Sequence, residues 1–297
     1  MSKLKIGYFG DGVWAHNALK MLLDDSGIEI MFVCGRFKES DQVLKKMAEK
    51  NKIVFITEEN INTVSFIKKI DKYNCDLLVS MSFDQIFKKD VINLCPHKLI
   101  NCHAGKLPFY RGRNVLNWAL INGEKEFGIT VHYVDEGIDT GDIIVQKTFR
   151  IDQNDNYGDV LKIAHVECAN LLYDAVTKIK DDRIIPIKQK DIHPVGFYCG
   201  IRKNGDERID WNQESEKIFN FIRGIAKPGP VARSYINDSE IKINRASLID
   251  EAPTYIGIPG QVVGKYKDTF VVKTRDTMLE IIEFDCDVRV QIGDRLI

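Results

Sequence analysis

The sequence has few of the features that mark disulfide-bonded, metal-binding or membrane-spanning proteins. Its seven cysteines are odd in number and scattered, and no C-x-x-C pair occurs, which argues against a disulfide framework and against a zinc site. No stretch approaches the roughly 18 to 20 apolar residues of a membrane span. The chain starts with MSKLK and runs into a strand pattern rather than an apolar leader. We therefore expect a cytoplasmic protein without membrane contact.

An excess of charge of one sign is also absent. The chain has 42 Lys and Arg residues against 43 Asp and Glu residues, which leaves a formal net charge of −1. With 44% hydrophobic and 29% charged residues, its 297 residues can bury one large core and a smaller second one. There is no internal repeat or low-complexity segment. This composition predicts a folded, soluble protein of one or two domains.

Short apolar runs alternate with helical patterns over the first hundred residues. Such alternation is typical of a Rossmann-like fold, an α/β architecture with a doubly wound, mostly parallel sheet. The apolar runs predict strands at residues 5–9, 29–34, 53–56, 77–80 and 99–102. The segments between them predict helices at residues 13–23, 40–50, 61–73 and 89–94.

The later part of the chain predicts a hairpin, a long helix and a second domain. Residues 127–134 and 142–149 form the predicted hairpin, and residues 156–180 form one amphipathic helix. From about residue 191 the composition shifts toward Pro, Gly and short strands, predicted at 231–236, 240–245, 261–263, 269–273 and 278–284. We expect a catalytic domain at 1–190 and a smaller β-rich, OB-like domain at 191–297.

An amide, an imidazole and a carboxylate lie near the ends of predicted strands, in Asn101, His103 and Asp139. A fixed amide can donate to the oxygen that becomes negative when an amine attacks an acyl carbon. Histidine is the side chain whose ordinary pKa lies nearest neutral pH, so it can take the proton of the amine. A carboxylate can orient the imidazole. Alone, an Asn-x-His pair is more often a locally hydrogen-bonded turn. Its place at the carboxyl end of a strand, where open α/β sheets bind ligands, favours catalysis.

The residues around this pair carry a family resemblance. The run NCHAGKLPFYRGR from Asn101 to Arg113, with Asn117-Trp118, Asn122-Gly123-Glu124 and Asp139-Thr140-Gly141-Asp142, resembles the 10-formyltetrahydrofolate-dependent formyltransferase family. RIDW at 208–211 and FIRGI at 221–225 resemble the segment that leads into the family's C-terminal domain, so the resemblance covers nearly the whole chain. It implies that Asn101, His103 and Asp139 are the catalytic trio, that 10-formyltetrahydrofolate donates the formyl group, and that no metal takes part.

The same resemblance places the folate. In the family, the pterin lies against the backbone of the loop after the fourth strand and against the segment before the catalytic Asp. The implied folate contacts here are Met81, Ser82, Phe83, Asp84, Gln85, Ile86, Val134, Asp135 and Gly137. The residue types leave a second reading open, in which Phe83 and Ile86 simply pack the start of a helix.

A glycine turn and a basic loop are the candidate contacts for the acceptor substrate. Gly10-Asp11-Gly12 departs from the G-x-G-x-x-G dinucleotide fingerprint, because Ala15 follows, but its amides could meet a phosphate. Arg111 and Arg113 could equally be solvated or paired with acids. The predicted substrate contacts are Gly10, Asp11, Gly12, Lys106, Tyr110, Arg111 and Arg113.

The charge of the C-terminal region helps to distinguish between the acceptor substrates that the family uses. A tRNA-binding enzyme needs a basic surface, yet residues 200–297 contain 15 Lys and Arg residues against 16 Asp and Glu residues. The loop at 35–41 is short and mixed in charge, whereas the tRNA branch of the family has a longer basic insertion there. YRGR at 110–113 resembles the sugar-modifying branch, which includes the aminoarabinose enzyme of lipid A modification. We therefore expect no nucleic-acid partner and a nucleotide-linked aminosugar as acceptor.

The expected acceptor is a dTDP- or UDP-linked 4-amino-4-deoxy or 4-amino-4,6-dideoxy sugar of the kind used in lipopolysaccharide and O-antigen. Glycinamide ribonucleotide enzymes resemble the first domain alone. Methionyl-tRNA formyltransferase and formyltetrahydrofolate hydrolase stay as alternatives, and formate release without an amine would identify the hydrolase. The oligomeric state is open, with a homodimer as one alternative. Histidines without metal-ligand spacing are predicted to be structural: His16, His97, His132, His165 and His193.

Overall fold

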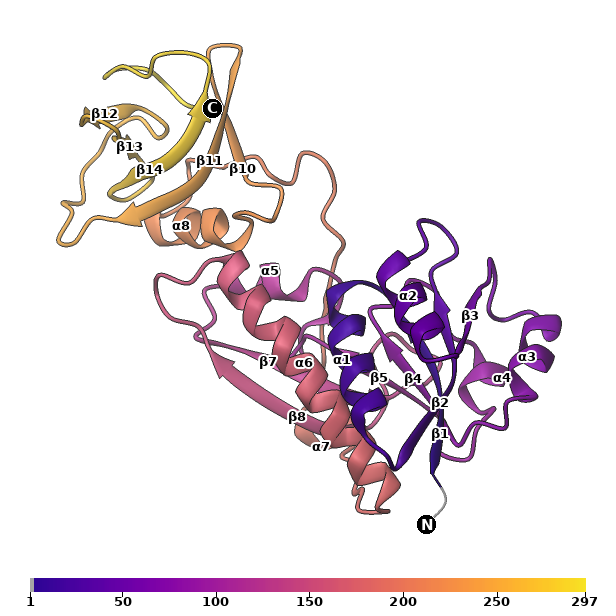
Figure 1. Ribbon diagram of the computed structural model, residues 1–297. Coiled ribbons are helices and arrows are strands. Elements are labelled where there is room, and N and C mark those ends of the chain that lie inside the picture. The colour runs from indigo at the N-terminus through magenta and orange to yellow at the C-terminus, as the bar shows by residue number, and fades with distance from the viewer. Residues whose placement is uncertain (1–2) are drawn as a thin grey trace. The chain divides into compact units, whose positions relative to one another are not determined.

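The computed structural model describes residues 3–297, and these fold into two compact units (Figure 1). Unit 1 consists of the described residues through Gly112, of Gly128–Phe149 and of Lys162–Tyr198. Unit 2 consists of Arg113–Phe127, Arg150–Leu161 and Cys199–Ile297. Two short segments of the first 190 residues therefore belong to the unit that contains the C-terminal sheet.

A seven-stranded sheet forms the centre of unit 1. Its strands are β1 (Leu4–Gly10), β2 (Ile28–Gly35), β3 (Val54–Thr57), β4 (Leu77–Met81), β5 (Leu99–His103), β7 (Glu126–Tyr133) and β8 (Ile143–Arg150), in the order β3-β2-β1-β4-β5-β7-β8. The first five are parallel, and β7 pairs antiparallel with β5. The strand order reverses between β1 and β4, as in a doubly wound sheet. The predicted Rossmann-like fold and the hairpin of β7 and β8 are confirmed.

Seven helices accompany the strands up to residue 192: α1 (Gly12–Asp24), α2 (Gln42–Lys50), α3 (Val64–Asp71), α4 (Lys89–Ile92), α5 (Val115–Ile121), α6 (Tyr157–Lys180) and α7 (Gln189–Ile192). Capping residues fix where α2 and α3 begin. The carboxylate of Asp41 accepts the N–H groups of Val43 and Leu44, and the hydroxyl of Thr63 accepts that of Phe66. Both helices therefore start two or three residues later than their hydrophobic patterns predict.

Aromatic side chains fill the core beneath the carboxyl ends of the parallel strands. The ring of Phe9 lies 5.5 Å from that of Phe32 and 5.2 Å from that of Phe87, centroid to centroid, in edge-to-face contacts. All seven cysteines are free, and five are buried. Burial raises the pKa of Cys34 and of Cys75 to about 12, so both remain thiols at neutral pH.

A five-stranded antiparallel sheet forms unit 2, which confirms the β-rich second domain. Its strands are β10 (Ala232–Ile236), β11 (Ser239–Leu248), β12 (Val262–Lys265), β13 (Phe270–Lys273) and β14 (Met278–Cys286), in the order β10-β11-β14-β13-β12. Leu296 bridges to Ile236 at the end of β10, and Arg295 bridges to Gln261 before β12, so the last residues of the chain join both edges of the sheet. This arrangement protects the two edge strands.

Helix α8 (Ser215–Gly224) contributes to the core of unit 2 and is not among the predicted elements. Its buried side chains Ile218, Phe219 and Ile222 follow helical spacing and pack with the apolar face of the sheet. Two short strands, β6 (Arg111–Gly112) and β9 (Tyr198–Cys199), pair with each other. Within residues 3–297, no helix is both long enough and apolar enough to cross a membrane.

Candidate active site

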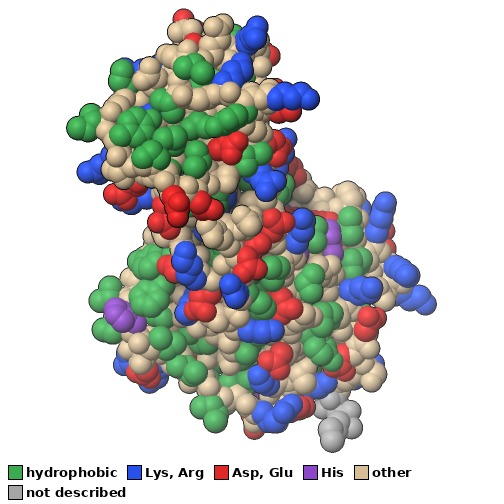
Figure 2. All heavy atoms as spheres, turned by 90° about the vertical axis from the view of Figure 1, so that its left-hand side faces the viewer, with side chains coloured by type: hydrophobic (Ala, Val, Ile, Leu, Met, Phe, Trp, Pro, Cys, Tyr) green, Lys and Arg blue, Asp and Glu red, His purple; other side chains and the backbone are tan. Residues whose placement is uncertain are grey.

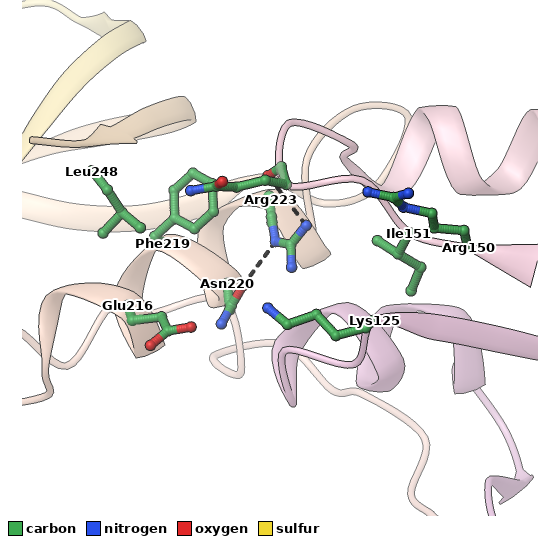
Figure 3. Close-up of a pocket in the computed structure, with 9 residues that line it drawn as sticks. Lys125, Arg150, Ile151, Glu216, Phe219, Asn220, Arg223 and Leu248 are labelled. Atoms are coloured by element: carbon green, nitrogen blue, oxygen red, sulfur yellow. Dashed lines mark hydrogen bonds between the residues drawn. The ribbon is translucent and has the colours of Figure 1, made fainter. Parts of the chain in front are cut away.

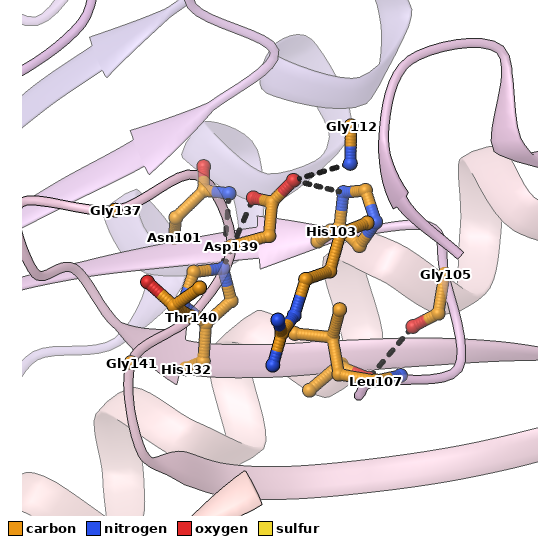
Figure 4. Close-up of polar contacts among 12 residues, drawn as sticks. Asn101, His103, Gly105, Leu107, Gly112, His132, Gly137, Asp139, Thr140 and Gly141 are labelled. Atoms are coloured by element: carbon orange, nitrogen blue, oxygen red, sulfur yellow. Dashed lines mark hydrogen bonds and ion pairs between the residues drawn. The ribbon is translucent and has the colours of Figure 1, made fainter. Parts of the chain in front are cut away.

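Strand register brings polar side chains together on one face of the large sheet. In the antiparallel pair of β5 and β7, Asn101 lies opposite His132, and His103 lies opposite Thr130. Residues two apart on a strand share a face, as do residues directly opposite each other. Asn101, His103 and His132 therefore project from the same side of the sheet, and Figure 4 shows them around the carboxylate of Asp139.

Asp139 reaches this face by a loop that folds back over the sheet. Because β7 is antiparallel to β5, its last residue Tyr133 lies opposite Ile100, near the start of β5. The loop must then reverse to bring Asp139 toward His103. Asp139 has a left-handed backbone (φ 54°), which aspartate tolerates better than most residues. At Gly141 a Cβ atom would overlap the carbonyl oxygen of Tyr133, so the reversal requires glycine.

Gln189, at the first position of α7, fixes the folded-back loop. Its Nε2 donates to the backbone oxygens of Asp139 and Gly141, at 2.8 Å each. Its Oε1 accepts from Nη2 of Arg111 at 2.6 Å, and the side chain is buried. Sequence reasoning missed Gln189, because its contacts span about fifty residues and follow no local pattern. Arg111, a predicted substrate contact, is thus engaged with Gln189 in the structure.

The carboxylate of Asp139 lies between two imidazoles. Its Oδ2 is 3.7 Å from Nδ1 of His103 and accepts the N–H of Gly112 at 2.9 Å. Its Oδ1 is 3.5 Å from Nε2 of His132. Burial alone would raise the pKa of Asp139, but the charge of His103, the contact with His132 and the Gly112 amide together hold that pKa well below its usual range. Asp139 is therefore ionised at neutral pH.

His132 contacts two members of the predicted trio. Its Nδ1 lies 2.7 Å from the carbonyl oxygen of Tyr133, an acceptor, so Nδ1 carries a hydrogen. In the neutral ring, Nε2 is then an acceptor, and Nδ2 of Asn101 lies 3.4 Å away and can donate to it. Sequence reasoning placed His132 among the structural histidines. The only signal that could have identified it is the register of β5 against β7, which the sequence does not show.

His103 is oriented by the backbone of the loop that follows β5. Its Nε2 lies 2.7 Å from the carbonyl oxygen of Tyr110, so this nitrogen carries a hydrogen and donates it. In the neutral ring, Nδ1 then has the lone pair and faces Asp139. A proton that arrives at Nδ1 would produce an imidazolium ion whose N–H points at a carboxylate, which stabilises the charged form.

Gly105 has no room for a side chain beside His103. A Cβ atom there would clash with Nε2 of His103 and with the carbonyl oxygen of Tyr110. We expect Gly105→Ala to displace the imidazole and to lower kcat for formyl transfer by about 10²-fold, the usual cost of misplacing a reacting group by about 1 Å. The matched control is Gly200→Ala, where a Cβ would meet no atom within 4 Å. Equal activity of both variants would contradict this role of Gly105.

The two loops of the predicted folate contacts border one apolar cluster. Met81 ends β4 and is buried, and the side chains of Phe83 and Val134 both pack against the cluster around Phe87. The side chain of Gln85 is engaged within the protein, since its Oε1 accepts from Ile61 at 3.1 Å. Four other predicted contacts lie in the same two loops and are partly or fully exposed, namely Ser82, Asp84, Ile86 and Gly137. Asp135 accepts the hydroxyl of Thr140 and stabilises the second loop.

The glycine turn after β1 is already hydrogen-bonded within unit 1. The N–H of Gly12 donates to Asp41 at 2.8 Å, and the N–H of Asp11 donates to the carbonyl of Met81, which follows from the adjacent ends of β1 and β4. These two amides are therefore not free to bind a phosphate in this structure. The guanidinium of Arg36 lies 3.2 Å from the Asp11 carboxylate.

The other predicted substrate contacts follow His103 in the chain. Lys106 and Tyr110 lie in the loop of unit 1 that follows His103, and the ring of Tyr110 contacts that of Phe197 at 4.9 Å. Arg113 belongs to unit 2, where its N–H donates to the carbonyl of Cys199. Across the described part of the chain, no group of three or more His, Cys, Asp or Glu side chains could hold a metal ion.

Comparison with known proteins adds two family matches. Residues 6–176 match the family described as Formyl transferase, and residues 202–289 match Formyl transferase, C-terminal domain. The methionyl-tRNA formyltransferase of Syntrophomonas wolfei is 35% identical over 240 residues, which cover 81% of this chain and 75% of that relative. The enzyme of the same name from Clostridium tetani is 30% identical over 286 residues, which cover 93% and 90%.

Two of the solved structures that resemble this one have sugar substrates in their names. WlaRD, a sugar 3N-formyl transferase solved with dTDP and 5-N-formyl-THF, has a TM-score of 0.71 and 25% identity over 98% of this chain and all of that one. The N-formyltransferase of Helicobacter canadensis, solved with folinic acid and dTDP-3-aminofucose, has a TM-score of 0.68 and 27% identity over 96% of this chain and all of that one. The curated relatives and the solved structures thus carry names with different acceptors.

Proposed function

Because this chain belongs to the formyl transferase family, we propose that it transfers a formyl group from 10-formyltetrahydrofolate to the amine of a nucleotide-linked aminosugar. The observation that carries the chemistry is the placement of Asn101 and His103 on one sheet face beside an ionised Asp139. These side chains supply a hydrogen-bond donor, a proton acceptor and a counter-charge. An amine that attacks a formyl carbon needs all three.

The folate supplies the formyl group when it is bound, and its fit to this chain is supported by the loops at 81–86 and 134–137. These loops follow two different strands of one sheet and border one apolar cluster, against which a ring system could lie. Their own polar side chains are largely engaged with each other or with neighbouring backbone, which leaves backbone groups for recognition. Such contacts select the pterin by shape and by backbone hydrogen bonds.

Each catalytic side chain has a role that follows from its contacts. Nδ2 of Asn101 has two N–H groups, of which one faces His132, so the other is available for the formyl oxygen as it gains negative charge. Nδ1 of His103 accepts the proton that the attacking amine loses. The carboxylate of Asp139 then stabilises the imidazolium at 3.7 Å, a separation that can shorten when substrate is bound.

Charge supports a sugar nucleotide as the acceptor. Residues 200–297 carry 15 cationic and 16 anionic side chains, and the connection from β2 to α2 has only six residues, Arg36 to Asp41. The face in Figure 2 shows Lys and Arg side chains interspersed with Asp and Glu rather than gathered into one basic area. A tRNA acceptor would need phosphate neutralisation by such an area. The dTDP compounds in the names of the two solved structures also favour a nucleotide-linked sugar.

Initiator methionyl-tRNA is the second candidate acceptor, because two relatives that are 35% and 30% identical to this chain are methionyl-tRNA formyltransferases. The purified chain should be incubated with 10-formyltetrahydrofolate and, in parallel, with dTDP- and UDP-linked 3-amino and 4-amino sugars, with initiator methionyl-tRNA, or with no amine. We expect turnover with at least one aminosugar nucleotide. Turnover with tRNA but with none of the sugars would show that tRNA is the acceptor. Formate release without any amine would indicate the hydrolase.

A further inference from the structure

A cavity of about 520 Å³ lies wholly within unit 2 and is separate from the proposed catalytic trio of unit 1 (Figure 3). It is formed where the start of β7 and the segment after β8 meet α8. Its volume lies within the range of small-molecule sites, roughly 300 to 1,000 Å³. Three cationic side chains and one carboxylate line it, namely Lys125, Arg150, Arg223 and Glu216.

Arg223 presents one free nitrogen to this cavity although its side chain is 93% buried, with a relative exposure of 7%. Its Nε donates to Oδ1 of Asn220 at 2.8 Å, and its Nη1 donates to the carbonyls of Asp152 and Asp155 at 3.2 Å each. Nη2 has no hydrogen-bond partner among residues 3–297. The other bonds of the guanidinium therefore fix its orientation, while the two N–H groups of Nη2 remain available to a ligand.

Lys125 brings a second cationic group to the same space. Figure 3 shows its ammonium group and the guanidinium of Arg223 facing each other across the cavity. No carboxylate of the described chain lies within 4.0 Å of the Lys125 ammonium. Glu216 also lines the cavity but forms no ion pair with either cation in the part of the chain described, and Arg150 is paired with Asp152 at 2.9 Å. Two like charges that converge repel each other. The carboxylates of Asp155 and Glu216 offset the charge of Arg223 without a direct ion pair in the described chain, so a bound anion would reduce the repulsion further.

The rest of the cavity wall is apolar. Phe219 and Ile151 are buried beside it, and the guanidinium of Arg223 lies 5.4 Å from the ring centroid of Phe219. Leu248 completes this side. A cavity with an apolar wall and a few convergent polar groups is the usual form of a small-molecule site. Free phosphate would use only the cationic end and leave the apolar side in contact with water.

We propose that this cavity binds a small molecule in which a phosphate group is attached to an apolar or aromatic portion. The phosphate lies between Lys125 and Nη2 of Arg223, where it accepts charge-assisted hydrogen bonds from both. The apolar portion packs against Phe219, Ile151 and Leu248. This site is distinct from the formyl-transfer reaction, since every residue that forms it belongs to unit 2.

Calorimetric titration of the full chain with phenyl phosphate and with inorganic phosphate tests this proposal. We expect phenyl phosphate to bind several-fold more tightly than inorganic phosphate. Lys125→Gln should weaken both by about tenfold, the usual effect of losing one hydrogen bond to a charged group, and Lys125→Arg should retain binding. Lys125 is exposed, so neither variant should disturb folding. The matched control is Lys267→Gln, which removes the same charge from an exposed position of unit 2 away from the cavity.

Three results would overturn the proposal. One is the absence of phenyl phosphate binding at about 10 mM, a concentration above the Kd of even a weak specific site. Another is equal affinity of the wild-type chain and Lys125→Gln, which would assign the bound phosphate to other cations such as those near His103. The third is equal affinity for the two probes, which would show that the apolar portion of the ligand contributes nothing to binding.

Discussion

Replacement of His103 by Asn is expected to lower kcat for formyl transfer by about 10³-fold, within the range of roughly 10² to 10⁴ that general acid–base catalysis contributes. The shorter Asn side chain reaches the position of Nδ1 but not that of Nε2, so it also loses the hydrogen bond to the carbonyl of Tyr110. It cannot take a proton at the position of Nδ1, 3.7 Å from Asp139. The attacking amine would then have to lose its proton to water.

Single-turnover kinetics with saturating donor and acceptor would measure this effect on the chemical step. His97→Asn is the matched control, because it makes the same substitution at an exposed histidine in the turn before β5. It should retain wild-type kcat. If His103→Asn kept more than about one tenth of the wild-type kcat, as expected of a group that does not transfer a proton, His103 would be a positioning residue rather than the base.

The strands of unit 1 could be predicted because the polarity of their side chains matches the burial of the strands in the fold. The runs at 5–9, 77–80 and 99–102 are apolar on both faces, as central parallel strands require, and each falls within one residue of β1, β4 or β5. Helix starts were less accurate. Asp41 and Thr63 act as caps, so the polar residues that precede α2 and α3 lie outside the helices.

The three residues of the proposed catalytic trio could be singled out in the sequence because they stand in recognisable local motifs. His132 and Gln189 could not, for a physical reason that is common to both. His132 is significant only because register places it opposite Asn101, and Gln189 only because α7 places its amide beside the Asp139 loop. Long-range pairing of this kind leaves no trace in the residue types. Helix α8, in contrast, has the apolar spacing of Ile218, Phe219 and Ile222, a signal that was present in the sequence.

Replacement of Asp139 by Asn is the second change with a large expected effect, a fall in kcat of about 10²- to 10⁴-fold, as for other carboxylates that orient a catalytic imidazole. The amide oxygen of Asn can still accept the N–H of Gly112, which preserves the loop. The charge that faces both His103 and His132 is lost, so the imidazolium of His103 is no longer stabilised. KM for the acceptor should change less than kcat, because the carboxylate acts through the imidazole.

The pH dependence of stability gives an independent test of the same charge. The pKa of Asp139 in the folded chain is depressed below the ordinary value, about 3.9. Its ionised form therefore stabilises the folded state above about pH 4, and this contribution is lost as the pH falls through the folded-state pKa. The difference in free energy of unfolding between wild type and Asp139→Asn should thus be full at pH 6 and shrink toward pH 3. Urea denaturation at both pH values would measure it.

Asp182→Asn provides the control for both experiments. Asp182 has a similar left-handed backbone, with φ 52° against 54° at Asp139, but its side chain is exposed. Its replacement removes the same charge from the same backbone geometry, so kcat should stay at the wild-type level. A kcat of Asp139→Asn within about threefold of wild type would show that the imidazole needs no counter-charge, since orientation by a carboxylate is worth far more than that. A stability difference that grows toward acid pH would show that the carboxylate is protonated in the folded state.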